Sequence, residues 1–340
     1  MRRGSILQLV VIGVIAGAIA GAVAYFVPWL PKPATLESER IDWVFWFVTI
    51  ICIVIFALVS AVIVYSVIHF RVAPDDENDG PPIHGHTGLE IVWTAVPAIL
   101  VTAIGVFSAI VLAKNDALGS NPLHVDVTAQ QFAWSFTYPE SNGLASTELR
   151  LPVHRSVQLR IHAKDVLHSF WVPQFGQKQD AVPGEITTLH ITPNRVGRFP
   201  IKCTELCGLG HAVMRATAIV MPAAEFDAWA AKQGQAQSGG GADAGKAIFA
   251  SNSCAGCHTL KAAGATGKVG PDLDNLPAFA KGTGQPLDAF IRESIVKPDA
   301  YIEKGFPPNL MPKTFGSSLS AQQLDALVSY LVASTRGGSG

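Results

Sequence analysis

The pattern of apolar and polar positions divides the chain into an apolar part, an alternating part and a helical part. Three long apolar runs come first, at Ile6–Val27, Ile41–Ile68 and Leu89–Ala113. Each run is long enough to cross a bilayer, since a helical span needs ~20 mostly apolar residues. The polar, turn-rich segment 72–88 separates the second run from the third. We therefore predict a transmembrane helical hairpin over residues 36–116.

The first apolar run, within residues 1–35, fits two alternatives. Arg2 and Arg3 before a hydrophobic stretch are typical of a cleaved signal peptide, and Ala22-Val23-Ala24 offers small residues for cleavage. The run is also long enough to remain as a membrane anchor. In both cases the arginines indicate a cytoplasmic N-terminal end. We expect the hairpin loop in the cytoplasm and everything after Lys114 on the outer side.

Residues 117–232 alternate between apolar and polar positions, which is the period of a half-buried strand. Short alternating segments are separated by turn residues such as Pro139, Gly143, Pro183 and Gly184. This arrangement predicts an antiparallel sandwich or Greek-key barrel. The strands are expected around residues 124–129, 156–162, 186–192, 199–202 and 216–220.

The last part of the chain is predicted to be a separate helical domain. A short helix is expected over Pro222–Lys232, and the Gln/Gly/Ala/Ser-rich residues 233–241 predict a flexible linker. Residues 242–340 then form the second exported domain, with helices expected over 243–250 and 319–331.

Composition supports a membrane protein with exported domains. Only 15% of the 340 residues are charged, and the mean hydropathy is positive. The formal net charge of −1 gives no support for nucleic-acid binding.

The loop from Cys203 to Met214 concentrates soft metal donors. Cys203, Cys207, His211 and Met214 lie within twelve residues, and thiolate and thioether sulfurs favour copper(I), zinc or iron–sulfur clusters. A mononuclear blue-copper site uses a single cysteine. Two cysteines four residues apart could instead each bridge a pair of copper ions, with a second imidazole from elsewhere. A disulfide is the alternative for a close pair in an exported domain.

Cys254-Ala-Gly-Cys257-His258 is the attachment signature of a c-type haem. The two thiols bond to the haem vinyl groups and His258 becomes the proximal iron ligand. Met311 is the candidate distal ligand, because it follows the motif within the same domain and Met/His ligation is typical of electron-transfer haems. A redox-active thiol pair is the alternative, but it leaves His258, Met311 and the segment Gly270-Pro-Asp-Leu273 without a role.

These motifs resemble a known family. Residues 36–232 resemble subunit II of the haem–copper cytochrome c oxidases, and residues 242–335 resemble a class I cytochrome c. The loop matches the specific pattern C-x-E-x-C-x-x-x-H-x-x-M. The resemblance implies a multidomain membrane protein: a helical hairpin, a cupredoxin-like Greek-key β-barrel and an all-α cytochrome c domain.

The resemblance also implies a binuclear copper centre, CuA, and assigns its ligands. Cys203 and Cys207 match the bridging thiolates, and His168 and His211 match the imidazoles. Met214 and the backbone carbonyl of Glu205 match the two weak ligands. The Glu205 carboxylate resembles a magnesium ligand at the contact with subunit I. His162 and His190, also on predicted strands, are expected to be structural.

Three further positions take roles from the resemblance. Glu90 matches a carboxylate at the cytoplasmic start of a transmembrane helix, where it marks a proton-channel entrance; an acid that stabilises the helix N-terminus is the alternative. The family usually has Trp-x-Trp on its electron path. Here Phe132 stands at the first tryptophan, which accepts electrons from cytochrome c, and Trp134 stands at the second.

The resemblance implies an electron relay in the bacterial plasma membrane, with the copper and haem domains outside. Electrons would pass from a cytochrome c or a quinol–cytochrome c reductase complex to haem c, then to CuA, then to haem a of subunit I. Oxygen reduction and proton pumping would occur there, and subunits I and III are the expected partners. Two alternatives stay open: a subunit of a nitric-oxide-reducing relative, and a free-standing membrane-anchored redox carrier.

Overall fold

The computed structural model describes residues 3–71, 82, 84–238, 242–313 and 315–336. The chain forms two compact units. The first comprises Met1–Lys32 and Glu39–Lys114, and the second comprises Pro33–Ser38 and Asn115–Gly340.

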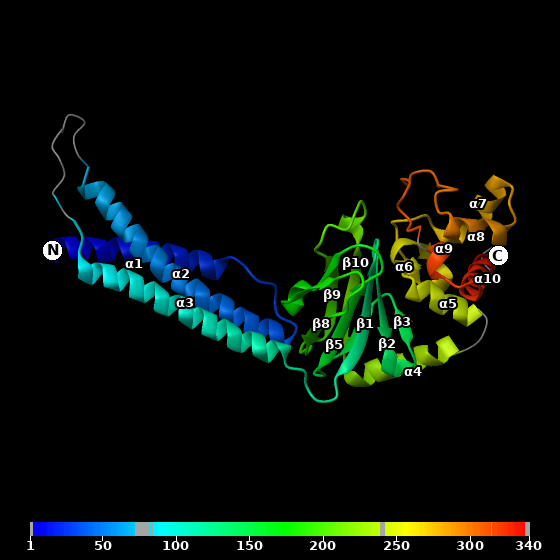
Figure 1. Cartoon of the computed structure of the whole chain (residues 1–340), viewed down its shortest axis with the longest axis horizontal. Helices are drawn as coiled ribbons and strands as arrows, with labels where there is room; N and C mark the ends of the chain where they lie inside the picture. The colour runs from blue at the N-terminus through cyan, green and yellow to red at the C-terminus, as the bar shows by residue number, and fades with distance from the viewer. Residues whose placement is uncertain (1–2, 72–81, 83, 239–241, 314, 337–340) are drawn as a thin grey trace. The chain divides into compact units, whose positions relative to one another are not determined.

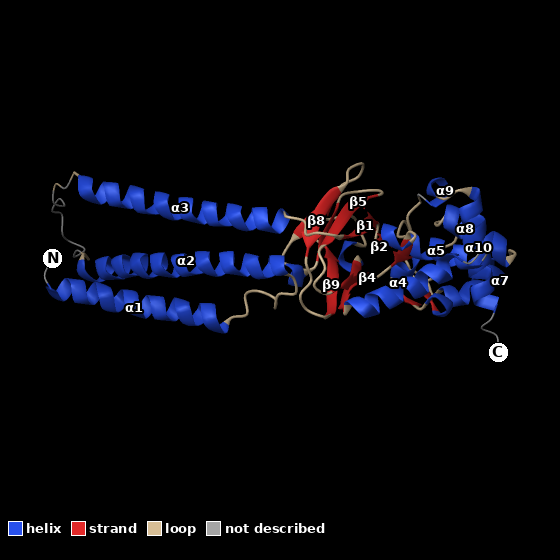
Figure 2. Cartoon of the chain, turned by 90° about the horizontal axis from the view of Figure 1, so that it is seen from below, coloured by secondary structure: helices blue, strands red, loops and turns tan. Residues whose placement is uncertain are grey.

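Three long helices account for the first unit: α1 (Arg3–Phe26), α2 (Leu36–His69) and α3 (Thr87–Asp116). Each is apolar and long enough to cross a membrane, and they run side by side in Figures 1 and 2. Gly17 of α1 faces Ala57 of α2, and Phe47 of α2 stacks edge-on against Phe107 of α3. With 34 residues, α2 has a length of about 51 Å, so it exceeds a ~30 Å hydrocarbon core, as its sequence predicts.

Two five-stranded sheets form the next domain. The first has the order β3-β2-β1-β5-β8 and the second β4-β10-β9-β6-β7, and both are visible in Figures 1 and 2. The predicted double-sheet architecture is confirmed, but the sheets are mixed and not purely antiparallel, because β1 pairs parallel with β5 and β10 pairs parallel with β4. The first sheet consists of β1 (Leu123–Gln130), β2 (Ala133–Tyr138), β3 (Leu144–Ser146), β5 (Val157–Ala163) and β8 (Thr187–Ile191). The second consists of β4 (Leu149–Pro152), β6 (His168–Trp171), β7 (Lys178–Ala181), β9 (Gly197–Cys203) and β10 (Arg215–Met221).

The alternation of side chains explains how the sheets enclose a core. Along β5, Val157, Leu159 and Ile161 are fully buried, whereas Gln158 and Arg160 between them are half-buried. Side chains from both sheets meet in one apolar cluster. The core therefore lies between the sheets and fixes their register, since a slip of one residue would expose its apolar set.

Helix α4 (Ala223–Ser238) follows the last strand and differs from the sequence prediction. It was expected to end at Lys232, but it continues through most of the segment predicted as a flexible linker. Four of the six residues at 233–238 are Gln or Ala, which are good helix formers, and the helix ends before the three consecutive glycines at 239–241. Trp229 of α4 packs edge-on against Tyr138, with ring centroids 5.2 Å apart.

A helical domain with its own apolar core completes the chain, as predicted. Its main helices are α5 (Ala242–Ser251), α7 (Leu276–Thr283), α8 (Leu287–Val296) and α10 (Ala321–Arg336), with short helices α6 (Cys254–Cys257) and α9 (Phe315–Ser318) and a small pair of strands, β11 (Thr259–Leu260) and β12 (Ala265–Thr266). Gly245 of α5 lies directly against Ala326 and Tyr330 of α10, where a larger side chain would clash. This close crossing joins the two ends of the domain.

Candidate copper and haem centres

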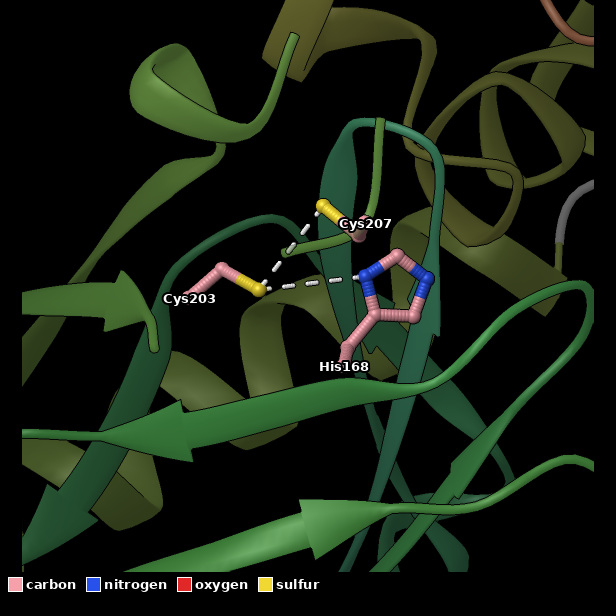
Figure 3. Close-up of side chains that lie close together, drawn as sticks. All are labelled: His168, Cys203 and Cys207. Atoms are coloured by element: carbon pink, nitrogen blue, oxygen red, sulfur yellow. Dashed lines mark hydrogen bonds between the residues drawn. The ribbon is translucent and has the colours of Figure 1, made fainter. Parts of the chain in front are cut away.

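Strand pairing brings the remote histidine to the cysteine loop. Cys203 ends β9, and β6 pairs antiparallel with β9 so that Phe170 lies opposite Cys203. His168 begins β6 and is fully buried. Figure 3 shows the imidazole of His168 and the thiols of Cys203 and Cys207 pointing toward one another. Their ligand atoms all lie within 4.8 Å of one another.

Cys203 Sγ has three potential metal donors around it. His168 Nδ1 and Cys207 Sγ each lie 3.9 Å from it, and the carbonyl oxygen of Glu205 lies 3.2 Å from it. The Glu205 side chain is half-buried.

Cys207 Sγ also has an imidazole and a weak donor close to it. His211 Nδ1 lies 3.6 Å from it and Met214 Sδ lies 3.8 Å from it. The short 3-10 helix His211–Val213 turns the chain so that both side chains face the cysteine. Each thiol thus has one imidazole and one weak donor, and all the residues predicted as copper ligands come together.

The donor set fits two copper ions. Both thiols are free, and their separation of 3.9 Å exceeds the ~2.05 Å of a disulfide bond. Metal–sulfur and metal–nitrogen bonds of ~2.0–2.3 Å, the lengths known for zinc, allow ions to lie between donors at these separations. The family's two bridging thiolates, two imidazoles and two weak ligands are all available.

The charges of the two thiols depend on each other. Burial would raise the pKa of Cys203, but hydrogen bonds from His168 and from the backbone of Ser169 lower it below the usual range. Burial raises the pKa of Cys207, and the neighbouring Cys203 thiolate raises it further. The second thiolate therefore needs positive charge beside it, which bound metal ions supply.

Asp165 orients the remote histidine. Its Oδ1 accepts a hydrogen bond from His168 Nε2 at 2.8 Å, so Nδ1 of the same ring remains toward Cys203. Burial would raise the pKa of Asp165, but hydrogen bonds from His168 and from the backbone of Gln131 hold it below the usual range. A carboxylate behind a ligating histidine is a common way to fix the ring orientation in metal sites.

In the haem motif, a hydrogen bond to one nitrogen fixes the ring of His258, as expected for an iron ligand. His258 Nδ1 lies 2.8 Å from the carbonyl oxygen of Pro271 and donates to it, which leaves Nε2 as the metal-binding atom. Gly270 packs against the face of this ring, and a Cβ there would lie 2.9 Å from Nδ1. Only glycine leaves room for the imidazole.

An apolar cavity of about 1320 Å³, part of which is open to solvent, lies over the motif. Cys254, Cys257 and His258 line one part of it and Met311 lines another. Phe249, Leu276, Phe290, Ile295, Tyr301 and Leu327 supply much of the apolar wall. The cavity therefore offers a large apolar group two attachment thiols, an imidazole and a thioether.

The two thiols of this motif are protonated near neutral pH. Burial raises the pKa of Cys254 to about 12. Burial also raises the pKa of Cys257, although a backbone hydrogen bond with Phe132 opposes the shift. Reactive redox thiols have a lowered pKa, so the site lacks the electrostatics of a thiol–disulfide centre.

Phe132 lies beside the copper loop, and Trp134 lies beside His168. The Trp134 side chain is 2% exposed, and its ring lies edge-on to that of His168 at a centroid distance of 6.2 Å. Phe132 is buried, and its ring lies against Gly208 and Gly210 of the loop, where a Cβ on either glycine would crowd it.

Glu90 lies in the first turn of α3. Its Oε1 accepts a hydrogen bond from the backbone N–H of His86 at 3.1 Å, and the Nδ1 of His86 accepts one from the backbone N–H of Leu89 at 3.2 Å. This is a reciprocal cap, so a local structural role for Glu90 is visible. Its place on a proton channel stays a prediction.

Sequence reasoning missed several supporting residues. Asp165 lies three residues before His168, and an acid at that spacing from a candidate ligand was a signal for it. Gly270 and Pro271 belong to a segment that the sequence singles out as unexplained by a redox thiol pair, but only the fold shows that they hold His258. Gln131 donates its side-chain amide to the carbonyl of Cys207, a contact between distant segments that no local pattern indicates.

Comparison with known proteins gives one consistent result. The family models described as cytochrome C oxidase subunit II, transmembrane domain and periplasmic domain, match residues 25–111 and 144–221. The cytochrome c model matches residues 242–335. Cytochrome c oxidase subunit 2 of Synechocystis sp. is 34% identical over 67% of this chain and 82% of its own length. That of Alkalihalophilus pseudofirmus is 33% identical over 83% of this chain and 84% of its own length.

A solved structure is also similar to part of the chain. The periplasmic domain of subunit II of cytochrome oxidase from Bradyrhizobium japonicum is 27% identical, with a TM-score of 0.34, over 35% of this chain and 98% of that one.

The three apolar helices, the double-sheet domain with its paired thiols and the C-x-x-C-H domain define a redox subunit of a membrane complex. The chain belongs to the cytochrome c oxidase subunit 2 family, in a form that carries a C-terminal cytochrome c domain. It is therefore a component of the oxidase and associates with other oxidase subunits. The family implies a CuA centre and a haem, with the domains that hold them on the outer side of the membrane.

Proposed function

We propose that this subunit passes electrons one at a time from an external donor, through a haem c held in the cavity above His258, to CuA and on to haem a of subunit I. The donor is a cytochrome c or a quinol–cytochrome c reductase complex, and the membrane is the bacterial plasma membrane. The observation that supports this most is the symmetric donor set around Cys203 and Cys207, in which each thiol has one imidazole and one weak donor within 4 Å.

Some residues would bind the copper ions, and another orients one of these ligands. Cys203, Cys207, His168 and His211 would hold the two copper ions, and Asp165 fixes the His168 imidazole. A rigid, buried ligand set changes little between oxidation states, which favours rapid electron transfer.

The haem site is held in the same manner. Cys254 and Cys257 would attach the haem, and the Pro271 carbonyl fixes His258 so that its Nε2 is free to bind the iron. Met311, which also lines the cavity, would be the distal ligand. An apolar wall and Met/His ligation both favour a high potential.

Two carboxylates connect the subunit to the rest of the oxidase in this proposal. Glu90 marks the cytoplasmic entrance of a proton channel that continues in subunit I. The Glu205 carboxylate holds a magnesium ion at the contact with subunit I. Oxygen reduction and proton pumping occur in subunit I.

Purification of a tagged chain from its own membranes tests the proposal. We expect a larger haem-containing subunit to co-purify and the complex to consume oxygen when the haem c is kept reduced. The Cys207→Ser variant should assemble yet lose this oxygen uptake, whereas Cys52→Ser, in helix α2, should keep it. Isolation of the chain alone would support a free-standing carrier, and reduction of nitric oxide in place of oxygen would support the nitric-oxide-reducing relative.

A further inference from the structure

The segment Gln130–Ala133, here called the docking segment, joins β1 to β2 and touches the haem domain. Both belong to the same compact unit. Gln130 Nε2 donates a hydrogen bond of 2.7 Å to the backbone carbonyl of Asn252, just before the haem motif. Gln130 and Asn252 are both buried. Since a buried polar group without a partner is costly, this pair selects one arrangement of the two surfaces.

A close backbone approach lies beside this hydrogen bond. Gly256, between the two haem-attaching cysteines, lies so near Ala133 that a Cβ on the glycine would be 3.1 Å from the alanine Cβ. Leu310, next to Met311, packs against the apolar core of the copper domain. Small residues on both sides therefore let the haem motif approach the docking segment closely.

Phe132 touches both redox sites. Its backbone forms a hydrogen bond with the Cys257 thiol, and its ring lies 3.3 Å from where a Cβ on Gly208 of the copper loop would be. Gln131 connects to the same loop through the Cys207 carbonyl and to the His168–Asp165 pair through its backbone N–H. A few bonded and hydrogen-bonded steps thus separate a haem-attaching sulfur from the copper ligands.

We infer that the docking segment is the binding surface for the chain's own haem domain, and that this domain shuts a separate electron-carrier protein out of the position at Phe132. This rests on the proposed relay. The Phe132 side chain is 5% exposed and that of Ala133 is 3% exposed with the haem domain in place. A carrier protein that binds specifically needs roughly 800 Å² of free surface on its partner. External donors therefore reduce the haem domain on another face. The arrangement also gives a reason for phenylalanine where relatives use tryptophan, because this position contacts a tethered domain and not a diffusing one.

Amide hydrogen exchange on the purified, copper- and haem-loaded oxidase tests the docking. The Gly256→Leu variant places a branched side chain where even a Cβ is tight. Gly282→Leu is the matched control, because in the described structure no atom outside its chain neighbours and its own helix backbone lies within 4 Å of a Cβ there. We expect the peptide covering residues 130–136 to exchange at least about tenfold faster in Gly256→Leu, with the wild type and the control alike. Equal exchange in all three chains contradicts the inference.

A second variant and a second readout keep the test independent of haem attachment and of oxidase activity. Gln130→Leu keeps a buried apolar residue on β1 but removes the donor to Asn252, and it should raise exchange in the same peptide. In stopped flow with a reduced soluble cytochrome c, the haem band of the wild type should change before the copper band. In Gln130→Leu, whose haem motif is unchanged, the copper band should no longer lag. Direct reduction of copper ahead of haem in the wild type would overturn the inference and also the haem-to-copper order of the proposed relay. Equal exchange in all variants together with haem-first reduction would overturn the docking alone and leave the relay intact.

Discussion

His168 and Asp165 form a ligand and its support: the carboxylate accepts a hydrogen bond of 2.8 Å from Nε2, while Nδ1 lies 3.9 Å from the Cys203 sulfur. One side of the ring is fixed by charge and the other faces the metal site.

Replacing Asp165 with Asn should weaken copper binding by about 10- to 100-fold, because the neutral amide orients and polarises the imidazole less well. Copper affinity, measured by competition with a chelator, checks this. Asp227→Asn, on an exposed turn of α4, is the control and should bind copper as the wild type does. An unchanged affinity in Asp165→Asn would mean that packing alone positions His168.

The Cys207→Ser substitution should abolish the mixed-valence spectrum of the copper pair. Serine cannot bridge two copper ions as a thiolate does, and Met214 and His211 lose their shared neighbour. The near-infrared and EPR spectra of the purified complex measure this, with Cys52→Ser as the control. Two bound coppers with an unaltered spectrum would show that the bridging assignment is wrong.

Replacing Met311 with Ala should leave the haem attached but lower its reduction potential, because a thioether ligand stabilises the reduced iron. A redox titration of the haem band gives the potential, and a denaturing gel stained for haem shows that attachment persists. Ile302→Ala, which also alters the cavity wall, controls for the change in packing. If both variants keep the wild-type potential, another residue is the distal ligand.

Glu90 offers a substitution that separates its two roles. Gln keeps the side-chain oxygen that accepts the hydrogen bond from the His86 backbone, but it cannot carry a proton. We expect Glu90→Gln to keep the wild-type melting temperature while slowing turnover and proton uptake several-fold, and Glu90→Ala to impair both. Turnover equal to that of the wild type in Glu90→Gln would leave helix capping as the only role.

His162 should make the copper domain less stable in acid. Burial lowers its pKa below 6.5, so the fold favours the neutral ring. This stability is present above pH 6.5 and is lost as the pH falls through the lower pKa of the folded state, because the unfolded chain takes up the proton more readily. The drop in melting temperature between about pH 7.5 and pH 5.5 should be smaller by about 1–3 °C in His162→Gln. His84→Gln, at an exposed position outside the copper domain, is the control.

Much of this architecture could be predicted from the sequence because its signals are local. The apolar runs predicted α2 and α3, and the predicted ends differ from the observed ones by up to five residues. The alternation of apolar and polar residues predicted β1, β5, β8, β9 and β10. The strands that were missed, such as β2 with its run of Ala133-Trp-Ser-Phe, are buried at nearly every position, so alternation is absent. The predicted end of α4, at Lys232, came too early, because glutamine and alanine next to glycine have the composition of a linker.

The candidate site divides in the same way. Cys203, Cys207, His211 and Met214 lie within one loop, so their spacing alone indicated them. His168 needed the family resemblance, because only the pairing of β6 with β9 brings it to Cys203. The hydrogen bond between Gln130 and Asn252 depends on how two domains of one chain pack. The periodicity of apolar residues gives no information about such packing.

Metal and haem analysis of the purified complex, together with its EPR spectrum, tests the proposed relay most directly. We expect two copper ions and one covalent haem for each chain, and a signal in which one unpaired electron is shared equally by two copper nuclei. A single copper, a zinc ion or a disulfide between Cys203 and Cys207 would contradict the proposal.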